Sequence, residues 1–154
     1  MNRLVFVWLT TLTMQACGPA GEDKESMDLN DIAVRYAAAW SSQDPDRHAA
    51  FYADDGVLQV NEGDPAIGRD AVRATAAAFM QGFPDMKVEL VELKGEFPNV
   101  EFHWHWTGTN TGPGGTGAYV DLYGYEAWTI SDDGLILQSL GHYDEAEYQR
   151  QLNQ

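Results

Sequence analysis

The sequence predicts an α+β fold in which three N-terminal helices pack on one face of a cone-shaped, curved antiparallel sheet. Apolar residues recur at helical spacing through most of the chain up to residue 83, and from residue 86 onward they alternate as they do in strands. Helices that precede an antiparallel meander, instead of alternating with its strands, are typical of the α+β class. A curved sheet closed by helices would enclose a pocket that is open at one end.

The helical part of the sequence divides into three segments. Asp28 is the expected cap of the first helix. The apolar stripe of that helix consists of Leu29, Ile32, Ala33, Tyr36, Ala37 and Trp40. Asp44 followed by Pro45 predicts the start of a second helix, which we expect to include Phe51 and Tyr52. After a short strand at residues 57–60, a third helix is expected over residues 68–83.

Four longer strands are expected in the second half of the chain. They cover residues 86–93, 100–109, 118–130 and 135–143, and a hairpin turn at residues 131–134 joins the last two. Strands of this length must bend, and Gly108 and Gly124 are positions where bending is easy. A short helix over residues 144–152 ends the chain.

Composition and charge exclude some classes of partner. The 154 residues suit one domain, and 44% of them are hydrophobic, which is enough for a sizeable core. The formal net charge of -15 repels phosphate backbones and anionic headgroups. We therefore expect no nucleic-acid partner and no binding to a lipid surface by charge.

The N-terminus resembles a bacterial lipoprotein signal. Arg3 precedes an apolar run at residues 4–14, which is too short to span a bilayer, and Cys17 is the only cysteine. Met14 and Gln15 depart from the usual residues before such a cysteine. We expect a signal peptide at residues 1–16, a flexible tether at 17–27 and a folded domain at 28–154. The alternatives are an ordinary secretory signal and a retained anchor.

Four stretches of the sequence resemble the SnoaL-like branch of the nuclear-transport-factor-two-like superfamily. They are YAAAWSSQDPDRHAAFYADDGVL (36–58), WTGTNTG (106–112), GYEAWTI (124–130) and DDGLILQSLGHYD (132–144). The resemblance covers roughly residues 28–152 and implies a cone-shaped α+β barrel, often dimeric through its sheet. Its founding members are polyketide cyclases that close a ring by an aldol step without metal or cofactor. Relatives isomerise ketosteroids, hydrolyse epoxides or dehydrate, and some only bind.

Glu126 is the first candidate for chemistry, because it lies where these cyclases place an acidic base. Its neighbours in mid-strand are Tyr125, Ala127 and Trp128, so the carboxyl would lose water and its pKa would rise. The alternative is a carboxylate on the solvent face. Asn110 lies where the cyclases have a histidine, and its alternative is a structural role in the turn of its loop. An amide donates a hydrogen bond to an oxyanion but does not shuttle a proton.

His103 and His105 are the second candidates, because side chains two residues apart share one face of a strand. We expect them to form a polar patch with Glu126 on the neighbouring strand. The alternatives are packed or surface histidines, and a metal site with Glu126 or His142 as third ligand. We expect no metal. Trp104 and Trp106 point to the other face, as core or as a dimer surface.

Three further residues are expected at the pocket. Trp40 and Tyr52 face the sheet from the helices and would line the cavity, as ligand-binding residues. His142 would lie at the cavity mouth, unless it caps the final helix together with Asp144.

These observations predict a small-molecule pocket protein of the bacterial cell envelope, a homodimer without a cofactor. As an enzyme it would be a cyclase, isomerase or lyase that acts on a hydrophobic carbonyl compound. The alternative is a non-catalytic ligand-binding or dimeric envelope lipoprotein. Epoxide opening ranks last, because that reaction usually needs an Asp–Arg–Asp cluster around a water, with the arginine on a strand. The candidate arginines lie in helical stretches; they are Arg35, Arg47, Arg69 and Arg73.

Lipidation at Cys17 is testable by one substitution. The full-length protein made in a bacterium should partition into detergent and carry the mass of a lipid. Three acyl chains exceed the two membrane signals that stable anchoring needs, so Cys17→Ser should move the protein to the aqueous phase. A variant that keeps both the membrane association and the mass of the wild type contradicts the lipoprotein prediction.

Overall fold

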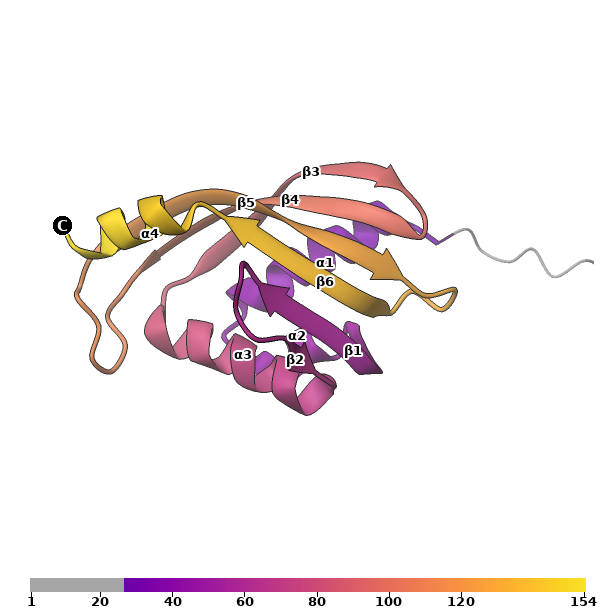
Figure 1. Ribbon diagram of the computed structural model, residues 1–154, viewed down its shortest axis with the longest axis horizontal. Coiled ribbons are helices and arrows are strands. Elements are labelled where there is room, and N and C mark those ends of the chain that lie inside the picture. Colours follow the sequence, from indigo (N-terminus) through magenta and orange to yellow (C-terminus); the bar gives the residue numbers. More distant parts are fainter. Residues whose placement is uncertain (1–26) are drawn as a thin grey trace, which may run out of the picture.

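The computed structural model describes residues 27–154, which form four helices and six strands (Figure 1). In chain order these are α1 (Leu29–Ser41), α2 (Pro45–Ala49), β1 (Tyr52–Val60), β2 (Ala66–Ile67), α3 (Arg69–Gly82), β3 (Lys87–Glu96), β4 (Asn99–Thr109), β5 (Tyr119–Ile130), β6 (Ile136–Tyr143) and α4 (Glu145–Leu152). Within these residues, no helix is long and apolar enough to cross a membrane. The signal peptide, most of the tether and Cys17 lie outside the described residues.

The two expected helix caps are confirmed. The side chain of Asp28 accepts a hydrogen bond from the Asp31 N–H at 3.0 Å. Asp44 accepts from the N–H groups of Asp46 and Arg47 at 3.1 and 3.2 Å. Each cap satisfies backbone donors that a helix start leaves without a partner, so these aspartates define where α1 and α2 begin.

The second helix is shorter than its sequence predicts. It ends at Ala49, and Tyr52 already belongs to β1, where it lies opposite Ile136 of β6. The carbonyl of Phe51 accepts a hydrogen bond from the Ile136 N–H at 2.8 Å. This long-range pairing with β6 overrides the local helical pattern, so Tyr52 comes from a strand.

The sheet confirms the α+β class but is mixed. Its strand order is β2-β1-β6-β5-β4-β3, and β3 to β6 form the expected antiparallel meander. The expectation of an entirely antiparallel sheet is wrong at one pair, because β1 runs parallel to β6. The chain reaches β6 from β1 only through α3 and the whole meander, so this pairing joins distant segments. The two-residue strand β2 pairs with β1 and has no signal in the sequence.

Helices α1, α2 and α3 lie on one side of the curved sheet (Figure 1). Alternation along β4 turns Phe102, Trp104 and Trp106 inward, and all three are buried. Gly124 of β5 lies directly opposite Trp104. A Cβ atom on Gly124 would lie 2.4 Å from the Trp104 ring, so this glycine leaves the space that the indole fills.

The expected basis for a dimer through Trp104 and Trp106 is wrong, because these side chains are only 8% and 4% exposed. The outer face of β5 instead presents Tyr119 and Tyr123, which are 58% and 66% exposed. Exposed aromatic side chains on a sheet face are typical of a contact with another protein surface. We propose that the homodimer forms through this outer face.

Sedimentation of the protein without residues 1–26 tests the dimer. At micromolar concentration we expect a dimer for the wild type and a monomer for Tyr123→Glu, since a buried, unpaired charge opposes association. Ile67→Glu is the control, because Ile67 is 65% exposed on β2 at the far edge of the sheet and should leave the dimer intact. A monomeric wild type contradicts the proposal.

Candidate functional site

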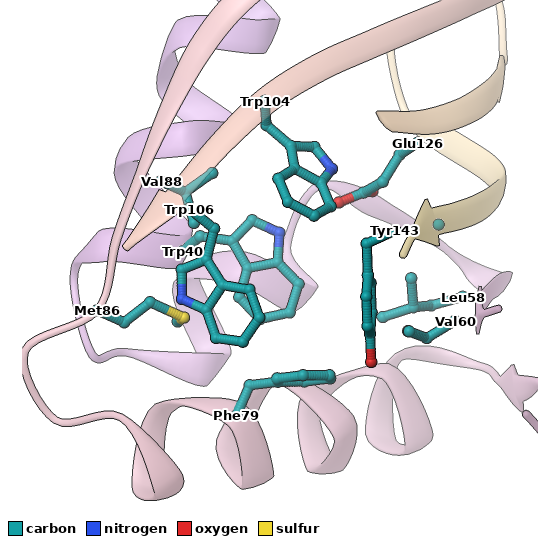
Figure 2. Close-up of a pocket in the computed structure, with 11 residues that line it drawn as sticks. Trp40, Leu58, Val60, Phe79, Met86, Val88, Trp104, Trp106, Glu126 and Tyr143 are labelled. Carbon is teal, nitrogen blue, oxygen red and sulfur yellow. The ribbon is translucent and has the colours of Figure 1, made fainter. Parts of the chain in front are cut away.

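A cavity of about 60 Å³ lies between the inner face of the sheet and helices α1 and α3 (Figure 2). Its wall is aromatic and aliphatic, with one carboxyl group. The lining residues that carry rings are Trp40, Phe79, Trp104, Trp106 and Tyr143. Leu58, Val60, Met86, Val88, Gly141 and Glu126 complete the wall. One enclosed water needs about 10–15 Å³ of such space, so the cavity holds a few waters or one compact organic group.

Glu126 is the acidic residue of this wall. It lies in the middle of β5, opposite Phe102 of β4 and Gly141 of β6, and only 6% of it is exposed. No lysine, arginine or histidine of residues 27–154 lines the cavity. Glu126 therefore lies in the wall of the pocket, and its carboxyl is largely removed from water, as the sequence predicts.

One oxygen of the Glu126 carboxyl is held by three donors. Oε2 accepts hydrogen bonds from the Tyr36 hydroxyl at 2.7 Å and from the Ser139 hydroxyl at 2.5 Å. The Trp128 indole N–H donates to the same oxygen at 3.1 Å. Oε1 accepts none of these three bonds. It is therefore the oxygen that a molecule in the cavity can use.

Burial and hydrogen bonding act in opposite directions on the Glu126 carboxyl. Loss of water raises its pKa above the usual range of a glutamate. Hydrogen bonds from Ser139, Trp128 and Tyr36 favour the carboxylate and limit that rise. The net direction is upward, which brings the proton of Glu126 closer to exchange near neutral pH.

A second layer of polar groups lies behind the carboxyl. The Tyr36 hydroxyl is 2.8 Å from that of Tyr52 and 3.0 Å from Nε2 of His48. His48 is fully buried, which lowers its pKa to about 3, so its ring is neutral near pH 7. A proton on Nε2 then donates to Tyr36, and Tyr36 directs its own proton to Glu126.

Sequence reasoning missed this layer. The sequence places Tyr36 on the apolar stripe of the first helix and Ser139 in a strand, and no pattern in it singles out His48. A tyrosine on a core-facing helical stripe needs a hydrogen-bond partner for its hydroxyl. That requirement was the available signal for Tyr36, whereas nothing in the sequence around His48 or Ser139 pointed to Glu126.

The expected grouping of His103 and His105 with Glu126 is wrong. The two strands do pair as expected, but His103 lies opposite Tyr125 and Glu126 lies opposite Phe102. Adjacent residues on a strand face opposite sides, so the histidines lie on the outer face. His103 Nε2 is 2.8 Å from Glu101, and His105 Nε2 is 2.8 Å from Asp121.

The remaining candidates divide between the wall and its surroundings. Trp40 lines the cavity, whereas Tyr52 lies behind it and contacts Tyr36. Asn110 has the loop role that was its alternative: its side chain donates to the Gly82 carbonyl at 3.2 Å and accepts from the Thr116 N–H at 2.8 Å.

His142 is not at the cavity mouth. Its ring lies 4.8 Å from that of Tyr125 on the outer face. Asp144 caps α4 through the Glu147 N–H, without His142. Among residues 27–154, no group of three or more histidine, aspartate or glutamate side chains is placed to hold a metal ion.

Comparison with known proteins agrees with this fold. The SnoaL-like domain family matches residues 33–139. A hypothetical protein with a ketosteroid isomerase-like fold from Catenulispora acidiphila DSM 44928, in complex with trimethylamine, has a TM-score of 0.72 at 16% identity, over 80% of this chain and 92% of that chain. A proposed SnoaL-like polyketide cyclase from Jannaschia sp. CCS1 has a TM-score of 0.71 at 21% identity, over 80% and 90%.

A phenazine biosynthesis-related protein from Pseudomonas aeruginosa is similar at a TM-score of 0.63 and 17% identity, over 82% of this chain and 92% of that chain. No curated protein sequence matches. At these identities the structural likeness shows the fold, and the family match extends over more than half of the sequence. The chain therefore belongs to the SnoaL-like domain family.

Proposed function

We propose that the protein binds a small hydrophobic carbonyl compound in the cavity and that Glu126 exchanges a proton with it, in a cofactor-free reaction of the cyclase, isomerase or lyase type. One observation supports this most: a buried carboxyl faces an apolar cavity with one oxygen restrained by three donors and the other open. A desolvated carboxyl of raised pKa suits proton transfer near neutral pH.

The hydrogen bonds assign different tasks to the two oxygens. Oε2 already accepts three bonds, so a proton taken up by the carboxyl resides on Oε1. The same oxygen removes a proton from a carbon acid when Glu126 is ionised. Because Tyr36 and Ser139 hold Oε2 from two different elements, α1 and β6, the direction of Oε1 is set before a ligand enters.

Binding without turnover is the second candidate function, and the position of the histidines favours it. His103, His105 and Asn110 were expected to share proton transfer or to bind an oxyanion, and none of them lines the cavity. Among the described residues, Tyr143 is the other titratable residue on the wall. Burial raises the pKa of its hydroxyl above the usual range of a tyrosine, and the nearby Glu145 adds to this rise. The wall is therefore suited to a hydrophobic ligand. Beside Glu126 it carries few side chains that could donate or accept a proton in a reaction.

Hydrogen–deuterium exchange at carbon tests the catalytic proposal without knowledge of the natural substrate. Cyclohexanone, acetophenone and related small ketones would be incubated with the protein in D₂O and followed by proton NMR. We expect the wild type to accelerate exchange next to the carbonyl for part of the panel. Glu126→Gln should lose about 10²–10⁴-fold of that rate, which is the usual contribution of a positioned base.

Glu101→Gln is the matched control, because Glu101 lies on the outer face beside His103. It should exchange at the wild-type rate. Equal rates for the wild type and Glu126→Gln would contradict a role for Glu126 as base. Ketones that bind without exchange would reject catalysis and support binding without turnover.

A further inference from the structure

Five aromatic rings surround the space beside Glu126. Figure 2 shows Trp104 above that space, Tyr143 on one side and Trp106 on the other. Trp40 and Phe79 close it from the helices. Three of the chain's five tryptophans therefore line one small cavity.

The Phe79 ring stands at right angles to two of the other rings. Phe79 is perpendicular to Trp40, at 90° with ring centres 6.0 Å apart, and perpendicular to Trp106, at 87° and 6.0 Å. The face of an aromatic ring is electron-rich and attracts a cation, most strongly for tryptophan. Several such walls around one space attract the same positive group together.

Within residues 27–154, no cationic side chain is paired with the carboxyl in this aromatic wall. Among residues 27–154, the buried polar or charged side chains are His48, Glu126, Ser139 and Gln151. The donors to Glu126 are neutral hydroxyl and indole groups. A buried carboxylate without a counter-charge is costly in free energy, so a cation in the cavity would be stabilised by the carboxylate as well as by the rings.

We propose that the cavity binds a small organic cation that carries a methylated ammonium group, with its methyl groups against the rings and its charge paired with Oε1 of Glu126. This inference rests on the proposed function only in that the cavity binds a small molecule. It names the group that meets Glu126, and such a cation competes with a carbonyl ligand for the same oxygen.

The apolar wall explains why methylation matters. A primary ammonium or a guanidinium needs several hydrogen-bond acceptors, and among residues 27–154 the polar side chains on this wall besides the indoles are those of Glu126 and Tyr143. A methylated ammonium group has an apolar exterior and makes no such demand. It also matches a cavity of about 60 Å³, which holds one compact group. The chain's net charge of -15 favours the approach of cations to the protein.

Choline and 3,3-dimethylbutan-1-ol provide the test, because they have the same shape and differ in charge. Calorimetric titration of the purified full chain should show choline bound roughly tenfold or more tightly than the neutral alcohol, the ratio expected when a desolvated cation meets aromatic faces. This comparison needs no variant. Glu126→Gln should remove most of the preference, and Glu101→Gln should keep it.

The pH dependence gives a second readout. Choline needs the carboxylate, so its affinity should rise with pH as Glu126 ionises, while the affinity of the alcohol stays constant. The groups that face Glu126 stay neutral at the pH values where Glu126 ionises. Burial raises the pKa of Tyr36 on α1 and of Tyr52 on β1, and it lowers the pKa of His48 on α2. Tyr143 on β6 also has a raised pKa. Glu126→Gln should make the choline affinity independent of pH.

The outcomes separate this inference from the proposed function. Equal affinities for choline and the alcohol would overturn the cation inference and leave the cavity as a binding site. Choline bound equally by the wild type and Glu126→Gln would place the cation elsewhere and also overturn it. If neither compound binds while ketone exchange persists, the cation inference alone fails. If both binding and exchange are absent, both proposals fail.

Discussion

The hydrogen bonds that converge on Oε2 of Glu126 are the interaction on which the site depends. They connect β5 to α1 through Tyr36, to β6 through Ser139, and to a neighbouring position of β5 through Trp128. Burying a carboxyl costs free energy unless its oxygens find donors. The packing of α1 against the sheet supplies one of these donors, so the helix layer and the site depend on each other.

Side-chain alternation along β4 separates two surfaces of different character. Trp104 and Trp106 turn toward the helices and line the cavity, while His103 and His105 turn outward and meet acidic side chains. Glycine at position 124 gives Trp104 its space. The aromatic cavity and the polar outer face are consequences of one register between β4 and β5, and a slip of one residue would exchange them.

Much of the fold and part of the site follow from the sequence. Local patterns predict the helix caps at Asp28 and Asp44 and the meander, because caps and alternation depend on near neighbours. Side-chain alternation places His103 and His105 on one face of the strand and Trp104 and Trp106 on the other. It does not determine which of the two faces is turned toward the helices. The β1–β6 pairing and the contact of Tyr36 with Glu126 join residues far apart in the chain. Such contacts have no local signature, so the sequence does not point to His48 or Ser139 as neighbours of this site.

Glu126 is a desolvated carboxyl at the cavity wall, and we propose that its proton is exchanged with a ligand there. Titration of its side-chain carboxyl carbon by ¹³C NMR in the ligand-free protein tests this most directly, with Glu126→Gln identifying the resonance. Burial should place the midpoint above the value of about 4.3 for an unperturbed glutamate. A midpoint at or below that value would contradict the account, because the carboxyl would then be hydrated or fully stabilised as an anion.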